Sequence, residues 1–418
     1  MYPWYTKFML GSDNMLKRTE ETKVMRDVIH GYIHVNLQII WDLIDTKEFQ
    51  RLRRIHQLGG DFQVYHTAEH SRFSHSLGVY EIVRRMVHEI RDIREYLSED
   101  EKAYVMIAGL LHDVGHFPFS HAFESICPIP HEEFSSRIIL GNSEIHDVLA
   151  KANPKLPQII ASIISYTYPK DLLNQIISGQ LDADRMDYLL RDAYFTGTSY
   201  GAFDLERILR TIRVKDEKLL VKESGIHSVE DYIMARYHMY WQVYYHPVCR
   251  SYEMILTKVF ERLRYLYLKT PEKIQHLGMF LPFLSGEPSI EDHFYLDESA
   301  ALYGIGLLTK HEDRIVQDLA SRLLNRKLFE YETIRKETQI EDVVKKLENH
   351  AYDANYYCII DTTSQNPYKP YGEKRGHVIW VLGEDNKIAE LSCKSVIVQS
   401  LVKGDTKKDR KIFFPKMI

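Results

Sequence analysis

Histidines and aspartates gather in two short stretches of this chain. The stretch from RFSHSLG to LLHDVGHFPFSH supplies His75, the adjacent pair His112 and Asp113, and His116. The stretch LDADRMDYLLRD supplies Asp184 together with other carboxylates. Imidazole nitrogen and carboxylate oxygen together suit divalent transition metals such as Mn, Fe, Co, Ni or Zn. The sequence therefore predicts a metal centre whose ligands come from distant parts of the chain.

Other polar residues near these stretches have simpler interpretations. A single His–Asp pair at a helix end is usually a cap or a surface ion pair, and only its place in a larger set favours a metal. His70 is expected to line a pocket or the surface, and Asp187 to lie on a helix face or beside a ligand. Arg51, Arg53 and Arg54 form a basic run of the kind that usually faces solvent.

The elements that must position these groups are predicted to be helices. Ser76–Ile93 places apolar residues three and four positions apart, which gives one apolar face. Glu99–Leu111 follows Ser98, a good N-terminal cap, and delivers His112 and Asp113 at its C-terminal end. Glu230–Tyr267 reads as one long aromatic-rich helix with a kink at Pro247.

The pattern changes after Gly278. A helical segment covers about Glu298–Arg326, and short runs typical of strands follow at Tyr356–Ile360, His377–Leu382 and Ser395–Gln399. We therefore divide the chain into a weakly ordered segment 1–22, a helical core 23–270, a helical extension 271–329 and a small α+β region 330–418.

Composition limits the classes of protein that remain. The chain has 418 residues, 44% of them hydrophobic and 27% charged, as in ordinary globular proteins. The longest apolar runs fall well short of the roughly 20 residues that span a bilayer, and no secretion signal is apparent. Four cysteines without a CxxC pair indicate reduced thiols and a cytoplasmic protein. The net charge of −5 argues against binding to extended nucleic acid.

Three longer segments carry a resemblance to a known family. The segments QLGGDFQVYHTAEHSRFSHSLGV, LLHDVGHFPFSH and DADRMDYLLRDAYFTGT resemble the HD-domain deoxynucleoside triphosphate triphosphohydrolases, which include the bacterial dGTP triphosphohydrolases and the SAM-plus-HD enzymes of animals. The similarity runs from about Lys23 to Glu261. It implies a mainly α protein, with a helical HD phosphohydrolase core and a smaller α+β C-terminal region.

The resemblance also implies roles for individual residues. The metal ligands would be His75, His112, Asp113 and Asp184. Catalytic roles fall on His116, Glu124 and His131, with Glu124 in place of the aspartate of the animal enzymes. The residues implied to bind the substrate are Gln57, Leu58, Arg72, Arg185, Tyr188, Asp192, Arg236 and Tyr244. The residues implied to bind an activating guanine nucleotide or dNTP between subunits of a homotetramer are Lys23, Asp45, Gln50 and Arg53.

The implied reaction cuts a dNTP between the α-phosphorus and the ribose 5′-oxygen, releasing deoxynucleoside and inorganic triphosphate. One divalent transition metal at the ligand set, with Mg on the triphosphate, would assist the attack. An imidazole would protonate the leaving oxygen, and arginines would offset the phosphate charge. The ring of Tyr188 would leave no room for a 2′-hydroxyl. Such an enzyme would lower or balance dNTP pools.

Two other classes of function remain open at this point. Another HD phosphohydrolase would be a 5′-nucleotidase, a cyclic-dinucleotide phosphodiesterase or a guanosine-tetraphosphate hydrolase. The chain lacks the second histidine-rich Gly-Tyr-Pro motif of the cyclic-dinucleotide enzymes, and a monophosphatase has less use for three phosphate-binding arginines. A non-catalytic nucleotide-binding module is disfavoured because all four ligand positions are intact.

Overall fold

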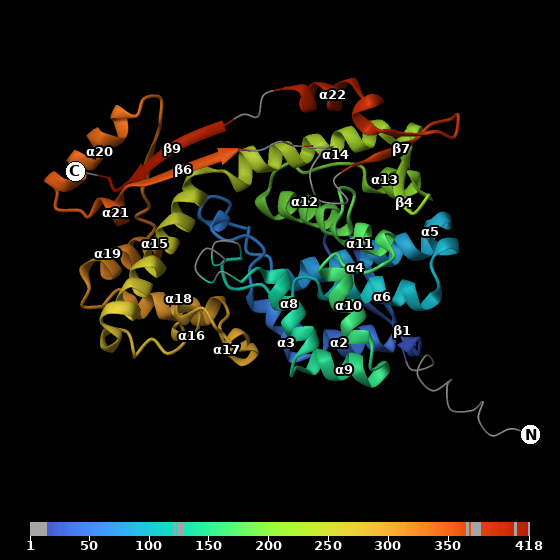
Figure 1. Cartoon of the computed structure of the whole chain (residues 1–418), viewed down its shortest axis with the longest axis horizontal. Helices are drawn as coiled ribbons and strands as arrows, with labels where there is room; N and C mark the ends of the chain where they lie inside the picture. The colour runs from blue at the N-terminus through green and yellow to red at the C-terminus, as the bar shows by residue number, and fades with distance from the viewer. Residues whose placement is uncertain are drawn as a thin grey trace, which may run out of the picture.

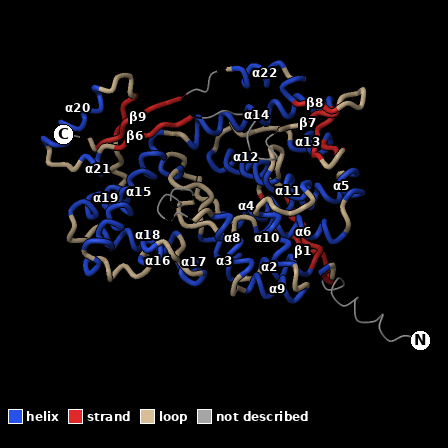
Figure 2. Tube along the Cα trace, viewed as in Figure 1, coloured by secondary structure: helices blue, strands red, loops and turns tan. Residues whose placement is uncertain are grey.

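A computed structural model describes residues 15–120, 123, 127, 129–364, 368, 378–404 and 408–416. The protein is mainly helical, as predicted, and three small sheets lie at the edges of the helical body (Figures 1 and 2). The helices are α2 (Gln38–Ile44), α3 (Lys47–Arg51), α4 (Arg72–Glu89), α5 (Arg91–Tyr96), α6 (Glu99–Leu111), α8 (His131–Leu140), α9 (Glu144–Ala152), α10 (Leu156–Ile164), α11 (Asp171–Ser178), α12 (Ala183–Thr196), α13 (Leu205–Thr211), α14 (Ile226–Met239), α15 (Pro247–Lys269), α16 (Leu281–Ser285), α17 (Ile290–Tyr295), α18 (Glu298–Leu308), α19 (Arg314–Leu324), α20 (Thr338–Asn349), α21 (Ala354–Tyr357) and α22 (Val396–Lys403).

Shorter turns and strands complete the fold. The 3-10 turns are η1 (Leu52–Arg54), η2 (Asp61–Gln63), η3 (Glu223–Gly225), η5 (Pro271–Lys273) and η6 (Leu391–Cys393), and η4 (Tyr240–Tyr244) is a π-helical turn. The strands are β1 (Arg18–Asp27), β2 (Gly31–Leu37), β3 (Ile212–Lys215), β4 (Lys218–Lys222), β5 (Glu330–Thr333), β6 (Ile359–Ser364), β7 (Trp380–Leu382), β8 (Ile388–Glu390) and β9 (Lys408–Phe414).

Helix α4 lies at the centre of the core. The predicted apolar face, which includes Leu77, Tyr80 and Val83, is buried, and so are Val79 and Ile82 on other faces. Helices α6 and α12 both pack against α4, which explains why burial extends around the helix. Within the described residues, no helix is both long and apolar enough to cross a membrane.

Helix α6 has the predicted bounds and cap. The Ser98 hydroxyl accepts from the backbone N–H of Glu101, and the Glu101 carboxylate accepts from the backbone N–H of Ser98. This reciprocal pair satisfies N–H groups that the first helical turn leaves without partners. The helix therefore starts at a fixed residue, and its end is fixed at His112.

The long kinked helix expected over Glu230–Tyr267 is two helices. Helix α14 leads into the π-helical turn η4, and α15 begins anew at Pro247. Proline has no N–H to donate and is favoured in the first turn of a helix. The break changes the direction of the chain and brings Tyr240 and Tyr244 to the pocket described below.

Regular structure begins nearer the N-terminus than the sequence predicted. Strand β1 starts at Arg18 and pairs antiparallel with β2, with an irregularity in register between Arg18 and Lys23. Most side chains of β1 are exposed, so the segment shows no alternation of polar and apolar residues. Residues 1–14 of the segment predicted as weakly ordered lie outside the described part of the chain.

The C-terminal residues contribute to two separate sheets. Strands β5, β9 and β6 form one sheet, whereas β7 and β8 extend the β3–β4 hairpin of the core, with β7 parallel to β4. Figure 1 shows the two sheets at opposite ends of α14. The strand expected at Ser395–Gln399 was a wrong prediction, because Ser395 caps helix α22. Tyr356 and Tyr357 end α21, and only Ile359 and Ile360 of that expected strand belong to β6.

Candidate metal centre and substrate pocket

The four predicted ligands meet at the ends of three helices. His75 lies in the first turn of α4, Asp184 in the first turn of α12, and His112 at the C-terminal end of α6, next to Asp113. His75 Nε2 lies 3.1 Å from Asp184 Oδ1, and His112 Nε2 lies 3.2 Å from Asp113 Oδ1. One ligand atom from each of His75, His112 and Asp184 lies within 4.8 Å of the others. This spacing fits one divalent ion, whose ligand atoms sit about 2.0–2.2 Å from the metal.

The hydrogen bonds of His112 indicate which nitrogen is available to a metal. Its Nδ1 lies 2.9 Å from the carbonyl oxygen of Gly109. Because a carbonyl oxygen can only accept a hydrogen bond, we assign the ring proton to Nδ1. Its Nε2 then bears a lone pair, is buried, and makes no hydrogen bond. That lone pair faces the carboxylate oxygens of Asp113 and Asp184, at 3.2 and 3.7 Å. Facing lone pairs repel one another, so the arrangement fits a cation between them.

Asp187 orients His75 from the opposite side. The Asp187 carboxylate lies 2.8 Å from His75 Nδ1 and 2.6 Å from His30 Nε2, and it accepts two hydrogen bonds from Arg191. A carboxylate behind a ligating histidine fixes the tautomer and the orientation of the ring. The place predicted for Asp187, beside a ligand, thus agrees with the structure.

Gly78 makes this contact possible. A Cβ atom at Gly78 would lie 1.9 Å from Asp187 Oδ1 and 2.5 Å from Arg191 Nη2. Both side chains are fully buried and hold each other, so neither can move aside. The glycine of RFSHSLG therefore lets α4 and α12 approach closely enough for Asp187 to reach His75.

The ionisation of the cluster reflects an excess of negative charge. Burial raises the pKa of Asp184, but the imidazoles of His112 and His75 beside its carboxylate outweigh burial and hold that pKa well below its usual range. Burial lowers the pKa of His75, but the Asp184 and Asp187 carboxylates outweigh it and raise the pKa to about 10. The carboxylates are therefore ionised, and a divalent cation would neutralise them.

A second cluster adjoins the first through Asp113. His116 Nε2 lies 3.4 Å from Asp113 Oδ1, and the rings of His116 and His131 stack with centroids 3.8 Å apart. A Cβ at Gly115 would lie 2.3 Å from His131 O, so a side chain there would push α8 away. Burial, Arg72 and His131 hold the pKa of His116 well below its usual range. These three influences outweigh the nearby Asp113 carboxylate, so His116 is a neutral imidazole at neutral pH.

A cavity of about 370 Å³ opens beside both clusters. Asp113, His116, His131 and Asp184 line one part of it. Seven of the eight residues predicted to bind substrate also line the cavity, namely Gln57, Leu58, Arg72, Arg185, Tyr188, Asp192 and Tyr244.

One of the predicted substrate-binding residues does not line the cavity. Arg236 does not line the cavity, and its Nη1 donates to Gln180 Oε1 at 3.2 Å. Its charge nevertheless acts on Tyr188, whose phenol does line the cavity. Glu124, predicted as the partner of a catalytic histidine, lies outside the described residues.

The arginines of the cavity hold fixed positions. Arg72 donates to Asp113 Oδ2 at 2.5 Å and to Ser120 Oγ at 2.9 Å. Arg185 donates to the carbonyl oxygen of Gly179 and to Asp182 Oδ2. Both residues line the cavity, and Arg72 contacts Asp113 directly, which places positive charge beside the proposed metal ligands.

Asp192 is tied to two rings at the other side of the cavity. The hydroxyl of Tyr244 donates to Asp192 Oδ2 at 2.7 Å, and His70 Nε2 lies 2.8 Å from Asp192 Oδ1. The Tyr188 and Tyr244 rings are close to perpendicular, with centroids 6.4 Å apart. His70 is buried and stacks on Phe195, so it supports the wall instead of binding metal.

The residues predicted to bind an activator lie outside this cavity. Gln50 donates to the carbonyl oxygen of Ile44, next to Asp45, and Arg53 Nε donates to Gln50 Oε1 at 2.8 Å. Lys23 lies on strand β1 and is exposed, as are Asp45 and Arg53. Asp45, Gln50 and Arg53 thus lie close together, whereas Lys23 lies on strand β1.

The basic run Arg51–Arg54 was predicted to face solvent, and for Arg51 this was wrong. Arg51 is 1% exposed and donates to the carbonyl oxygens of His116, at 2.8 Å, and Leu296, at 2.6 Å. Burial lowers its pKa to about 9. It ties the loop after α6 to the helical extension, and the spacing of three arginines gave no sign of this.

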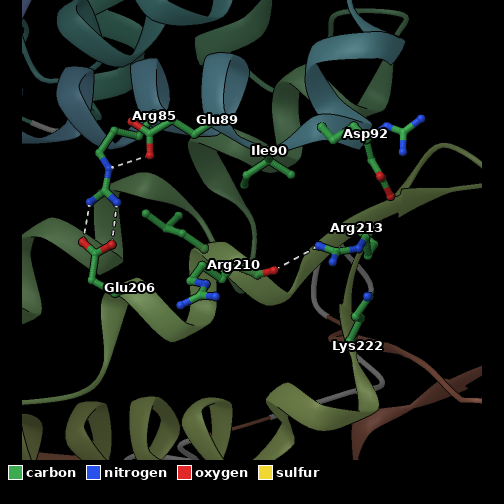
Figure 3. A pocket seen from close by; sticks show the side chains of 10 residues that line it. Arg85, Glu89, Ile90, Asp92, Glu206, Arg210, Arg213 and Lys222 are labelled. Atoms are coloured by element: carbon green, nitrogen blue, oxygen red, sulfur yellow. Dashed lines mark hydrogen bonds and ion pairs between the residues drawn. The ribbon is translucent and has the colours of Figure 1, made fainter.

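A larger cavity of about 630 Å³ lies between the end of α4, α5, α13 and the β3–β4 hairpin. Figure 3 shows Arg85 clamped by both oxygens of Glu206, and Arg213 donating to the carbonyl oxygen of Arg210. It contains none of the residues predicted to act in catalysis or to bind substrate.

Family comparisons match the region that holds the metal cluster. Residues 72–192 match the HD domain, and residues 203–277 match the HD associated region. The uncharacterized protein YwfO of Bacillus subtilis (strain 168) is 45% identical over 409 residues, which cover 96% of this chain and 93% of that protein.

A named enzyme and a solved structure are also similar. The deoxynucleoside triphosphate triphosphohydrolase SAMHD1 homolog of Dictyostelium discoideum is 32% identical over 263 residues, 60% of this chain and 51% of that protein. This chain therefore matches about half of that relative's length. The crystal structure of a phosphohydrolase from Bacteroides thetaiotaomicron has a TM-score of 0.82 and 27% sequence identity, covering 95% of this chain and 100% of that one.

Proposed function

This chain belongs to the HD-domain phosphohydrolases with an HD-associated region, and we propose that its substrates are deoxynucleoside triphosphates. The products would be deoxynucleoside and inorganic triphosphate. One observation carries the proposal: a single cavity joins the His/Asp cluster to two arginines, and then to a wall formed by Asp192, Tyr188 and Tyr244. A substrate with phosphates at one end and a sugar and base at the other fits this order.

The His/Asp cluster would hold the divalent metal. His75, His112, Asp113 and Asp184 would be its ligands, and a bound ion would polarise a phosphoryl oxygen and lower the pKa of a water. The fixed guanidinium groups of Arg72 and Arg185 would bind phosphate oxygens and hold the α-phosphorus in place. Positioning and charge neutralisation of this kind are most of what phosphoryl transfer requires.

His116 and His131 would supply the proton for the 5′-oxygen. Their stacked rings line the cavity beside Asp113, within reach of a phosphate held by Arg72. A bound triphosphate brings negative charge next to His116, which favours its protonated form. A proton donated to the leaving oxygen then lets the deoxynucleoside depart as a neutral alcohol.

The sugar would lie against Tyr188 and Asp192. The Asp192 carboxylate, held by His70 and Tyr244, can accept from a 3′-hydroxyl. The Tyr188 ring would occupy the space next to C2′, so a 2′-hydroxyl would collide with it. The enzyme would therefore favour deoxynucleotides over ribonucleotides.

We further propose a nucleotide activator that binds between subunits of a homotetramer, at Lys23, Asp45, Gln50 and Arg53. The exposed Arg53 and Asp45 would pair with phosphate and with the N–H edge of guanine, respectively. Sedimentation with and without GTP or dGTP would test this proposal. Assembly that does not change, together with hyperbolic kinetics in every nucleotide mixture, would contradict it.

Product analysis tests the proposed reaction. The protein, with Mn²⁺ or Mg²⁺, would be incubated with each dNTP alone and with all four, beside His112→Ala as a control. Deoxynucleoside and triphosphate that appear only with the wild type are the expected result. Monophosphate with pyrophosphate would indicate another HD phosphohydrolase, and binding without turnover would indicate a non-catalytic module.

A further inference from the structure

The loop before η2 is pressed against α15. A Cβ at Gly59 would lie 2.8 Å from Phe119 O, and a Cβ at Gly60 would lie 3.0 Å from Tyr252 Cδ1 and 3.1 Å from Cys249 O. A side chain at Gly59 would collide with the backbone of Phe119, and one at Gly60 would press on α15. The next residue, Asp61, is therefore fixed between α15 and the cavity, which it lines.

The carboxyl of Asp61 has an unused oxygen. Asp61 is 3% exposed, and its Oδ1 is buried without a hydrogen-bond partner. The Cys249 thiol of α15 lies beside the carboxyl. A buried polar atom without a partner destabilises the fold, and such atoms commonly have a functional partner that is absent.

The charges around Asp61 exclude phosphate as that partner. Besides burial, the carboxylates of Glu253 and Asp192 act on Asp61, and all three residues line the same cavity. The cations of the cavity, Arg72 and Arg185, contact Asp113 and Asp182 near the metal cluster instead. A triphosphate is therefore attracted to the metal end and repelled from the Asp61 end. The distribution of charge therefore favours one orientation of an elongated nucleotide, with its base toward Asp61.

We propose that Asp61 recognises the hydrogen-bonding edge of the substrate's base and sets base preference; this rests on the proposed dNTP hydrolysis. The rings of Tyr240 and Tyr244 and the side chain of Leu58 line the same cavity and supply apolar walls for a flat base. A polar group inside such walls discriminates strongly, because a base that offers no partner leaves the group unpaired.

The protonation state of Asp61 defines what it offers to the base. Burial, with the charge of Glu253, raises the pKa of Asp61 well above its usual range. This shift favours the protonated form, in which the carboxyl presents one donor and one acceptor side by side. An asparagine presents the same pair in nearly the same shape, whereas a leucine fills the space without either group.

The base preference of two Asp61 variants tests the proposal, because asparagine should restore what leucine removes. The kcat/KM values for dGTP, dATP, dCTP and dTTP would be measured for the wild type, Asp61→Leu and Asp61→Asn. We expect the wild type to differ by tenfold or more between its best and worst base, in line with the loss of one buried hydrogen bond. Asp61→Leu should remove most of that difference, and Asp61→Asn should keep the ranking. Asp61→Ala, which also lacks both groups, serves the same purpose as Asp61→Leu if the leucine variant does not fold.

The controls separate this proposal from the proposed function. Asp342→Asn, at an exposed position of α20, should keep the wild-type values. Uniform loss over all four dNTPs in Asp61→Leu, or a wild type without base preference, would overturn the role of Asp61. If the wild type hydrolyses no dNTP, the proposed function fails. The dissociation constants of the four deoxynucleosides then decide on Asp61, and equal constants, or no binding, overturn its role.

Discussion

The two polar cavities of this molecule differ in how their charged groups are satisfied. In the arginine-lined cavity of about 630 Å³, Arg85 is clamped by Glu206, whose side chain is 67% exposed. In the smaller cavity, of about 370 Å³, buried atoms of Gln57 and Asp61 lack partners, and His112 Nε2 lacks one in the cluster beside it. The larger cavity thus carries surface ion pairs and other charged groups that remain in contact with solvent. The smaller cavity carries unbalanced buried groups, which an ion and a substrate would satisfy.

The volume of a cavity is therefore a poor guide to the functional site. Buried polar groups without partners cost stability, and a fold retains them where a ligand uses them. Surface ion pairs cost little and contribute little. Substitutions in the two regions should therefore have effects of very different size.

The largest effect is expected at a metal ligand. Asp184→Ala removes one carboxylate of the cluster, so metal retention should fall. Turnover should drop by about three orders of magnitude or more, as for other groups that act as a unit. Metal content by mass spectrometry and dNTP turnover would be measured on the same samples. Wild-type metal content with wild-type turnover would contradict the assignment of Asp184.

The next largest effect is expected at Gly78, behind the metal centre. In Gly78→Ala, the new methyl group collides with Asp187 and Arg191. The free energy of unfolding should fall by about 3 kcal/mol, as in overpacked cores, and metal affinity should fall with it. Urea unfolding and metal titration would check this. Gly306→Ala is the matched control, because that helical glycine has no atom within 4 Å of its added Cβ and should be neutral or slightly stabilising.

Asp27 of the N-terminal hairpin pairs with Arg191, which also holds Asp187. This ion pair predicts that the free energy of unfolding depends on pH. Burial raises the pKa of Asp27, but Arg191 outweighs it and lowers the pKa overall. An acid with a depressed folded pKa stabilises the fold above its unfolded pKa of about 3.9 and loses this effect as pH falls. Asp27→Asn should therefore lower the free energy of unfolding by about 1–2 kcal/mol at pH 7. The difference from wild type should shrink below about pH 4; a difference that stays constant from pH 7 to pH 3 would contradict it.

The smallest effect is expected in the arginine-lined cavity. Glu206→Gln breaks the clamp on Arg85, whose side chain is 18% exposed. The free energy of unfolding should change by less than about 1 kcal/mol, and the change should shrink in high salt. Metal content should stay at the wild-type value. A loss of metal in this variant would mean that the two cavities are coupled.

Sequence patterns predicted the helical core well because they reflect local rules. The N-terminal cap at Ser98 and the apolar spacing of α4 depend on neighbours in the chain, and both are confirmed. The end of α6 at His112 follows from the same local signals. Ligands placed at helix ends are therefore predictable in position even when their partners are distant.

Contacts between distant segments were not predictable in the same way. Arg51 is buried because Leu296, far along the chain, supplies a carbonyl oxygen. Ser395–Gln399 has the β-branched residues of a strand, yet the Ser395 side chain is free to cap α22. Asp61 drew no attention in the sequence, because its importance depends on α15 lying behind it. The glycine pair before it was the available signal, since adjacent glycines often mark a close approach of backbones.

Metal reconstitution tests directly whether hydrolysis depends on a metal at the His/Asp cluster. Protein stripped with EDTA would be titrated with Mn²⁺, while bound metal and dNTP hydrolysis are measured in the same samples. We predict no turnover without metal and recovery in proportion to one tightly bound ion per chain, with neither binding nor recovery in Asp184→Ala. Full turnover in the stripped protein, or equal recovery in Asp184→Ala, would contradict a metal-dependent reaction at this cluster.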